Sequence, residues 1–260
     1  MAHRPIAPGC LVTLQPGAER PPVYCFHPLS GSVAVYGGLA RHLGAEQPVH
    51  GFQSTGLAAG GEPDISVAVM AERYAAAIDD ETAVFLGYSM GGVLALETAR
   101  AVAGIAPPLV VVIDCDPLYS STTGEGWSIL VHQTLGLDMP VAGLSALDRV
   151  DALVRVRAAA SAAGVLPARF GLERLDRMLA VCAANERAAA EHTPAYYDGT
   201  VHVFRSNDHP VVPGADMWNG FAREVHLQVI DADHHSIMTA RGWAAVGAGI
   251  RRLLTQVTTR

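Results

Sequence analysis

The sequence predicts an α/β fold in which a mostly parallel sheet is covered by helices on both faces. Short apolar runs alternate with amphipathic ones over the first two-fifths of the chain, and strand-like runs return after residue 200. Continuous apolar strands interleaved with helices are typical of such a sheet. No strand is expected between residues 119 and 194, where we predict a helical insertion. A chain of 260 residues can bury a full core, and we predict a single domain over residues 1–260.

Strands are expected where apolar residues run together, and helices where they recur at helical spacing. The predicted strands are Val23–Phe26, Val49–Phe52, Ala83–Leu86, Leu109–Ile113, Val201–Phe204 and Glu224–Ile230. The predicted helices are Val33–Leu43, Ser66–Ile78, one that continues through Val93–Arg100, Ala146–Ala163, Leu172–Ala190 and Ala240–Leu254. A helical insertion at the carboxyl ends of strands lies where a lid would cover the ligand crevice. A second packing layer without mobility is the alternative, and the sequence does not decide between them.

Composition and charge argue against several classes of function. The formal net charge of −7 disfavours a nucleic-acid partner. All 18 basic residues are arginine, which excludes a P-loop lysine, a lysine Schiff base to pyridoxal phosphate and any catalytic lysine. No apolar stretch reaches the roughly 18 residues of a membrane span, and no HExxH pattern supports a zinc hydrolase. The N-terminus lacks the apolar core of a signal peptide and the four cysteines form no CxxC pair, so we expect reduced thiols in the cytoplasm.

One segment carries a chemical signature. Gly87-Tyr88-Ser89-Met90-Gly91 matches the pattern G-x-S-x-G, after a predicted strand and before a predicted helix. In α/β-hydrolases a serine nucleophile lies on such a turn, which exposes its hydroxyl group. A side chain at Gly87 or Gly91 would collide with the neighbouring backbone. We therefore predict an α/β-hydrolase fold with Ser89 as the nucleophile, the alternative being a spectator serine in a glycine-rich turn.

A serine hydroxyl needs a general base, usually a histidine that a carboxylate orients. In α/β-hydrolases the acid and then the histidine follow the serine along the chain. The loop after the last predicted strand offers His234 and His235, which position alone barely separates. Three carboxylates follow strands, namely Asp114, Asp116 and Asp208. Asp116 precedes a proline and is expected to shape the turn, whereas the residues alone do not decide between Asp114 and Asp208.

The oxyanion that forms on attack needs two backbone N–H donors. One is expected at Met90, the residue after the nucleophile, where the positive end of its helix helps. The other is expected in the loop that follows the strand Val23–Phe26. Leu29 is the candidate there, because Pro28 has no N–H to donate. A tight loop without a donor role is the alternative.

With these pieces placed, the chain resembles the thioesterase domains that release products from nonribosomal peptide synthetases and related polyketide synthases. The resemblance runs from Leu11 to about Leu254. The segments that carry it are Val12–Gly17 followed by Pro21–Pro28, Val49–Leu57, Gly87–Gly92, the lid-helix segment Leu179–Asn185 and the closing histidine motif Asp233–Met238.

The resemblance implies a role for several residues. In that family the first histidine of the closing motif is catalytic, which selects His234 over His235. The family's acid normally follows the strand after the nucleophile helix, which selects Asp114. Related discrete editing thioesterases carry the acid one strand later, which would select Asp208.

The resemblance also implies the reaction. Ser89 takes an acyl or peptidyl chain from a thioester on the phosphopantetheine arm of a carrier protein. Water then releases an acid, or an amine or hydroxyl group within the chain closes a ring. The arm belongs to the partner, so no cofactor and no metal of the protein's own are expected, and we expect a monomer without a nucleic-acid or membrane partner.

Several alternatives to product release stay open. They are a discrete editing (type II) thioesterase, a general serine esterase, and a ligand binder with this fold but no catalysis. The sequence begins at Met1 and carries no carrier domain. Both an excised terminal domain and a free-standing enzyme fit this, and the sequence does not distinguish them.

Overall fold

The computed structural model describes residues 10–17, 20–78, 83–102, 107–118, 127–137, 143–144, 146–208 and 217–258. The strands are β1 (Leu11–Gln15), β2 (Val23–Phe26), β3 (Val49–Phe52), β4 (Val84–Tyr88), β5 (Leu109–Ile113), β6 (Tyr197–Ser206) and β7 (Ala222–Ile230). The α-helices are α1 (Gly37–His42), α2 (Val67–Ala75), α3 (Met90–Ala101), α4 (Trp127–Leu135), α5 (Arg149–Ala162), α6 (Leu172–Ala190) and α7 (Ala240–Thr258). Short 3₁₀ helices are η1 (Ala34–Tyr36), η2 (Thr55–Leu57), η3 (Met217–Gly220) and η4 (Ser236–Met238).

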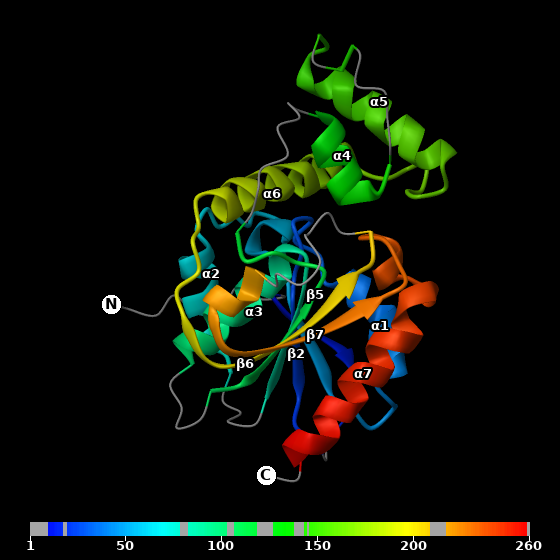
Figure 1. The fold of residues 1–260 in the computed structure, drawn as a ribbon. Coiled ribbons are helices and arrows are strands. Elements are labelled where there is room, and N and C mark those ends of the chain that lie inside the picture. The colour runs from blue at the N-terminus through cyan, green and yellow to red at the C-terminus, as the bar shows by residue number, and fades with distance from the viewer. Residues whose placement is uncertain are drawn as a thin grey trace.

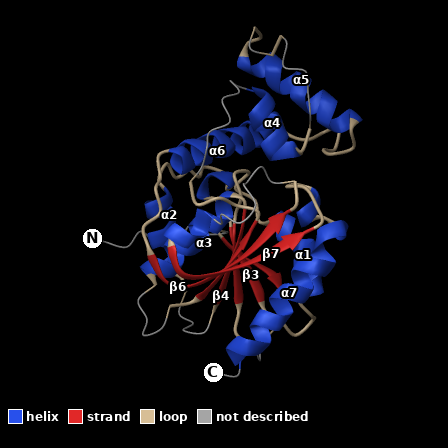
Figure 2. Cartoon of the chain, viewed as in Figure 1, coloured by secondary structure: helices blue, strands red, loops and turns tan. Residues whose placement is uncertain are grey.

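The strands form one sheet in the order β1-β3-β2-β4-β5-β6-β7. Strands β2 to β7 run parallel, and β1 pairs with β3 in the antiparallel sense. The predicted α/β fold with a mostly parallel sheet and surrounding helices is thus confirmed (Figure 2). Every predicted strand is present. The edge strand β1 was not predicted, and β6 begins at Tyr197 instead of Val201.

Helices cover both faces of the sheet because its strands are apolar on both sides. In β5 the side chains of Val110 and Val112 belong to the core shared with α2 and α3. Those of Val111 and Ile113 belong to the core shared with α1 and α7. The alternation follows from the period of two residues along a strand. The carboxyl ends of β4 and β5 therefore lie side by side, between the two helical layers.

Helices α4, α5 and α6 lie between β5 and β6 in the chain, beyond the end of the sheet to which β6 and β7 point (Figure 1). They have a hydrophobic core of their own, which includes Val131, Leu153 and Leu175. Helices α5 and α6 stand where two helices were predicted, whereas α4 was not predicted. Within the predicted insertion 119–194, residues 119–126, 138–142 and 145 lie outside the described residues.

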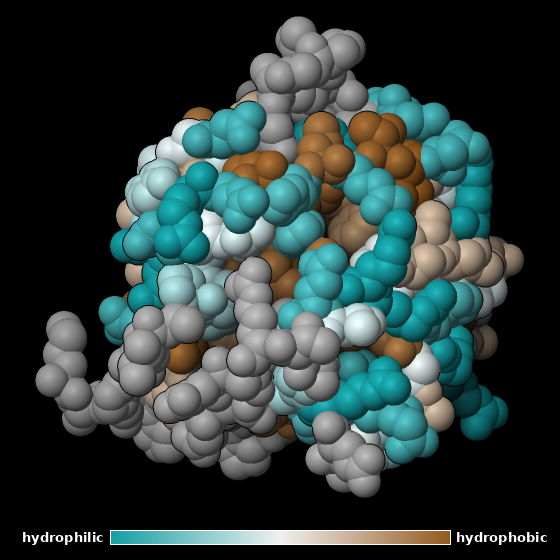
Figure 3. All heavy atoms as spheres, turned by 60° about the horizontal axis from the view of Figure 1, so that its bottom comes forward, coloured by the Kyte–Doolittle hydropathy of each residue, from teal (hydrophilic) through white to brown (hydrophobic). Residues whose placement is uncertain are grey.

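The surface, the helices and the cysteines were compared with the expectations of no membrane span and of reduced thiols. In Figure 3, hydrophobic side chains on the visible face gather in patches that hydrophilic side chains separate. In the described part of the chain, no helix combines the length and the apolar character needed to cross a membrane. The four cysteines are buried and unpaired.

Candidate active site

Ser89 lies on a sharp turn between β4 and α3. Its φ of 54° and ψ of −136° are unusual for a residue other than glycine, and such strained backbone concentrates at functional sites. A Cβ at Gly87 would collide with the carbonyl oxygen of Gly91, and a Cβ at Gly91 would collide with that of Phe26. Both glycines of the motif are therefore required by close backbone contacts, as the sequence predicted.

Hydrogen bonds to the end of β5 and to a tyrosine of η1 hold this turn. The backbone N–H of Ser89 donates to the carbonyl of Ile113 at the end of β5 (3.0 Å). The buried hydroxyl group of Tyr36 accepts from the N–H of Tyr88 (2.7 Å) and donates to the carbonyl of Phe26 (2.6 Å). Because its neighbours are fixed in this way, the strained conformation of Ser89 persists in the folded protein.

The structure brings His234 and Asp114 together. His234 Nδ1 lies 2.7 Å from Asp114 Oδ2, so the ring donates through Nδ1 and leaves Nε2 for other chemistry. Asp114 directly follows β5 and, like Ser89, has a positive φ, here 46°. Its other oxygen, Oδ1, accepts from the N–H of Ser206 (2.7 Å) and from its hydroxyl group (2.8 Å). A buried carboxylate is thus held on both oxygens and orients the histidine.

The charge state of Asp114 follows from these contacts. Burial by itself would raise its pKa. The hydrogen bonds from His234 and Ser206 outweigh burial, and the pKa lies below its ordinary value. Asp114 is therefore ionised at neutral pH, as a carboxylate that stabilises a developing imidazolium must be.

Tyr88 connects the nucleophile's turn to the histidine. Its ring stacks on that of His234, with centroids 5.0 Å apart and planes 29° apart. Its hydroxyl group donates to the carbonyl of His234 (2.8 Å), and burial raises the pKa of Tyr88 well above its ordinary value, so the donor stays protonated. The residue that precedes Ser89 therefore fixes both the backbone and the ring of His234.

The alternative residues lie elsewhere. Asp208 is exposed in the turn after β6, and Asp116 forms an ion pair with Arg205 (2.9 Å). His235 contacts His132 of α4, with 2.7 Å between their Nε2 atoms. Between the histidines, the structure thus joins the first and not the second to the acid.

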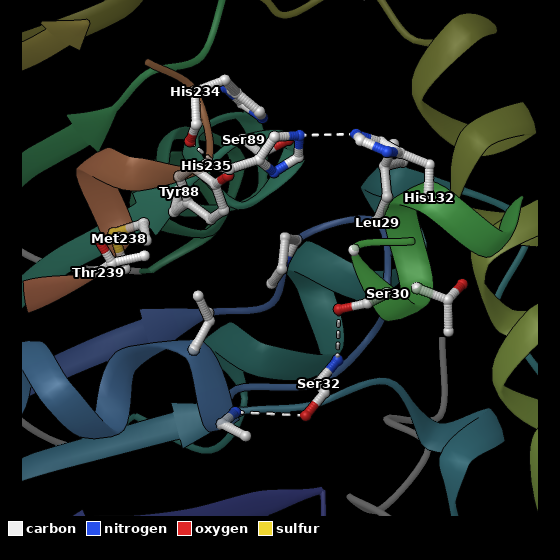
Figure 4. Close-up of a pocket in the computed structure, with 15 residues that line it drawn as sticks. Leu29, Ser30, Ser32, Tyr88, Ser89, His132, His234, His235, Met238 and Thr239 are labelled. Atoms are coloured by element: carbon white, nitrogen blue, oxygen red, sulfur yellow. Dashed lines mark hydrogen bonds between the residues drawn. The ribbon is translucent and has the colours of Figure 1, made fainter. Parts of the chain in front are cut away.

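A cavity of about 350 Å³ opens onto these groups. Ser89, His234 and His235 lie on one side of it, and His132 reaches towards them from α4 (Figure 4). The loop after β2 contributes Leu29, and α4 contributes Thr134. The walls thus come from the sheet's loops and from the helical segment between β5 and β6.

Of the two predicted oxyanion donors, Leu29 lines this cavity and Met90 directly follows Ser89, which lines it. Met90 is the first residue of α3. Among the described residues, neither the N–H of Leu29 nor that of Met90 has a hydrogen-bond acceptor. Both groups are free to bind an oxygen atom. Within the same residues there is no group of three or more His, Cys, Asp or Glu side chains that could hold a metal ion.

Sequence reasoning missed Ser206, His132 and Tyr88 as parts of this site. Ser206 had a usable signal, because it ends a strand that runs parallel and adjacent to the strand before Asp114. His132 had none, because nothing in the sequence joins α4 to the closing loop.

Three comparisons with known proteins agree with the geometry. The family model described as "Thioesterase domain" matches residues 21–250. Malpinin synthetase of Mortierella alpina is 36% identical over 92 residues, which is 33% of this chain and 1% of that protein. The probable non-canonical nonribosomal peptide synthetase CymA of Salinispora arenicola is 23% identical over 95% of this chain and 3% of its own length. The chain thus spans a small part of the curated relatives it matches.

Solved structures give the same result. The wild-type Vlm2 thioesterase domain is 26% identical, with a TM-score of 0.68 over 93% of this chain and 96% of that one. The NocB thioesterase domain, at 19% identity, shares the fold with a TM-score of 0.64 over 94% of this chain and 98% of its own.

Proposed function

This chain belongs to the thioesterase domain family, and we propose that it takes an acyl or peptidyl chain from a carrier-protein thioester onto Ser89 and then releases it. Its type is that of the thioesterase domains of nonribosomal peptide synthetases. The observation that carries the proposal is the bond between His234 and Asp114 beside the cavity that Ser89 lines.

In the first half-reaction His234 acts as the general base. With Nδ1 donating to Asp114, its neutral ring has a free lone pair on Nε2, which takes the proton of the Ser89 hydroxyl group. The serine oxygen attacks the thioester carbonyl carbon, and the N–H groups of Leu29 and Met90 stabilise the oxyanion. The C–S bond then breaks, and the leaving thiolate takes the proton back from His234.

In the second half-reaction the acyl-Ser89 ester is resolved. His234 removes a proton from water, or from an amine or hydroxyl group of the bound chain, and that group attacks the ester carbonyl. The bond between the carbonyl carbon and the Ser89 oxygen then breaks, and the serine oxygen takes the proton back from His234. Water gives a free acid, and an internal nucleophile gives a ring. The phosphopantetheine arm arrives with the carrier protein, so in this proposal the chain supplies no cofactor and no metal.

The relatives support a carrier-bound peptide as the substrate. Those matched over short segments include nonribosomal peptide synthetases, such as a dimodular one of Bacillus subtilis. A Vlm2 thioesterase domain was solved with a tetradepsipeptide bound, and it is 25% identical to this chain. We propose the same class of substrate here, and a monomer that meets its carrier in the cytoplasm, where buried free thiols persist.

Product release is favoured over editing by the position of the acid. The histidine is paired with the carboxylate after β5, which the resemblance gives to the product-releasing type, and not with Asp208 after β6. A discrete editing thioesterase remains the second candidate, and general esterase activity the third.

A fluorophosphonate probe tests the nucleophile. We expect one covalent adduct per chain on Ser89, located by peptide mass spectrometry and absent in Ser89→Ala. Ser30→Ala serves as the control, because Ser30 lines the same cavity but lies outside the strained turn. A correctly folded chain without an adduct on Ser89 would refute the serine mechanism.

A panel of carrier-bound acyl groups tests the reaction. The proposal expects fast release of long acyl or peptidyl chains, as acid or ring, and slow release of acetyl groups, read by mass spectrometry of the carrier. Fast clearance of acetyl alone would assign editing instead. Rapid turnover of simple esters with no action on carrier thioesters would assign a general esterase.

A further inference from the structure

The peptide group that joins Pro28 to Leu29 is held from its carbonyl side. The Pro28 oxygen accepts from the N–H of Gly31 and lies 2.9 Å from Nδ1 of His27. A carbonyl oxygen only accepts, so Nδ1 of His27 carries the hydrogen and donates it. In a trans peptide the N–H points away from the C=O, so fixing the Pro28 oxygen fixes the direction of the Leu29 N–H.

The tautomer of His27 is set from its other side. Nε2 lies 2.9 Å from the hydroxyl group of Tyr74, a fully buried side chain of α2. With the hydrogen on Nδ1, neutral Nε2 accepts from that hydroxyl group, so both contacts agree with one tautomer. Burial lowers the pKa of His27 to about 4, which keeps the ring neutral at physiological pH. In the hydrogen bonds from Tyr74 to His27 and from His27 to Pro28, each donor thus meets an acceptor.

A residue of α6 holds the next peptide group, which joins Leu29 to Ser30. Nδ2 of Asn185 in α6 donates to the carbonyl of Leu29 (2.9 Å), and Val181, one turn earlier, packs against Gly31 of the same loop. Asn185 is fully buried, and its Oδ1 has no hydrogen-bond partner among the described residues. A half-satisfied amide costs stability at a buried position, so packing alone gives no reason for an asparagine there.

We propose that His27 and Asn185 are positioning residues that clamp the peptide groups on either side of Leu29 and so aim its N–H at the oxyanion formed on Ser89. Neither side chain lines the cavity, and both act through the backbone. The proposal rests on the proposed function, because it needs an oxyanion at Ser89. It gives α6 a role in the geometry of the reaction in addition to its place over the sheet.

A matched pair of substitutions tests His27. In His27→Asn the amide nitrogen takes the place of Nδ1 and keeps the donor to Pro28. In His27→Gln the amide lies where Nε2 was, facing Tyr74, and the donor is lost. Loss of one oxyanion donor typically lowers kcat about 10²–10³-fold, so a misdirected donor in His27→Gln should lower kcat about 10- to 100-fold with KM unchanged. His27→Asn should stay within about 3-fold of the wild type.

Asn185→Leu separates the clamp from a packing role. Leucine removes the unpaired oxygen, which favours stability, and the donor to the Leu29 carbonyl, which lowers it, so the free energy of unfolding should change little while kcat falls about 10- to 100-fold. Gln47→Leu is the matched control, because Gln47 is also a buried amide whose oxygen, Oε1, has no partner among the described residues. It bonds to Pro21, away from the cavity, and the substitution should leave kcat unchanged.

The readouts are kcat per serine titrated with the fluorophosphonate probe, which corrects for misfolded protein, and the Ki of a peptidyl boronic acid. Boronates bind as tetrahedral adducts, so Ki should rise in parallel with the fall in kcat in His27→Gln and Asn185→Leu. An unchanged kcat per titrated serine in both variants overturns the clamp and leaves the proposed function intact. A wild-type chain with no titratable serine overturns both.

Discussion

The two regions that enclose the cavity are built differently. In the sheet region, Ser89 and Asp114 directly follow β4 and β5, His234 follows β7, and hydrogen bonds fix each of them. The helical region, α4 to α6, has its own small core. Among the described residues, side-chain hydrogen bonds from His132 to His235 and from Asn185 to Leu29 join it to the loops of the cavity.

In the proposed mechanism the sheet region thus carries the reacting groups, and the helical region helps to position them. Every group that the proposed mechanism charges or deprotonates belongs to the sheet region, where hydrogen bonds hold it. The helical region supplies walls and, through Asn185, the direction of one donor. Removal of the charged group in the sheet region should therefore slow the chemical step most, and a change in the helical region should slow it by no more than the loss of one oxyanion donor.

The largest effect on kcat is expected from a substitution of Asp114. Asp114→Asn removes the charge that orients His234 and stabilises its protonated form, so kcat should fall by about 10⁴. Asp208→Asn, at the exposed alternative, should change kcat by less than about 3-fold. Steady-state kinetics on a carrier-bound substrate measure both. The opposite ranking would move the acid to the end of β6 and remove the main argument for a product-releasing type.

The sequence pattern alone does not decide between Asp114 and Asp208 as the acid. Asp114 and Asp208 both follow strands of one parallel sheet, so the pattern places both at the same edge. What separates them is tertiary: the positive φ of Asp114, its hydrogen bonds to Ser206, and the reach of the closing loop. The family resemblance selected the residue that the structure pairs with His234.

The sequence did not predict β1 and α4, because the burial of each depends on other elements of the fold. Strand β1 is an edge strand with two partly covered faces, so its residues show no clear alternation, and its position depends on antiparallel pairing with β3. Strands β2 and β5, buried on both faces, have the predicted bounds because burial requires a continuous apolar run. Helix α4 is short, and its buried residues Val131 and Leu135 contact a core that other helices complete.

A second, smaller effect is expected at Ser206. Ser206→Ala removes the hydroxyl donor to Asp114 and keeps the N–H donor, so kcat should fall about tenfold, as one charge-assisted hydrogen bond is lost. The pKa of Asp114 should rise, because the lost hydrogen bond stabilises its ionised form. Ser236→Ala is the control in the closing loop, because Ser236 bonds to the backbone of Asp233 and not to the acid. An unchanged kcat in Ser206→Ala would contradict the role of this hydroxyl group.

The acid stability of the chain should depend on the sheet region. Burial would raise the pKa values of Asp114 and Glu97, but hydrogen bonds outweigh it and lower both, and hydrogen bonds from Ser236 lower the pKa of Asp233 to about 2. A carboxyl with a lowered pKa stabilises the fold above its unfolded pKa, and this is lost as the pH falls through the folded pKa. The free energy of unfolding, from denaturant titrations, should thus decline from about pH 4 downwards. The decline should be shallower in Asp114→Asn, and an equal slope would refute the contribution.

The smallest effect is expected where the two regions touch. His132→Ala removes the contact between α4 and His235, a hydrogen bond with a net contribution of about 1 kcal/mol, so opening of α4 should speed up about fivefold. Amide hydrogen exchange of α4 and of β5 measures this, and β5 should not change. His226→Ala, which breaks a stacked pair with His202 inside the sheet region, should leave α4 exchange as it is. Because His132 carries no charge or proton in the proposed mechanism, kcat should change less than about 3-fold. A fall in kcat of His132→Ala as large as that of Ser206→Ala would show that His132 takes part in the reaction and not only in the contact between α4 and the closing loop.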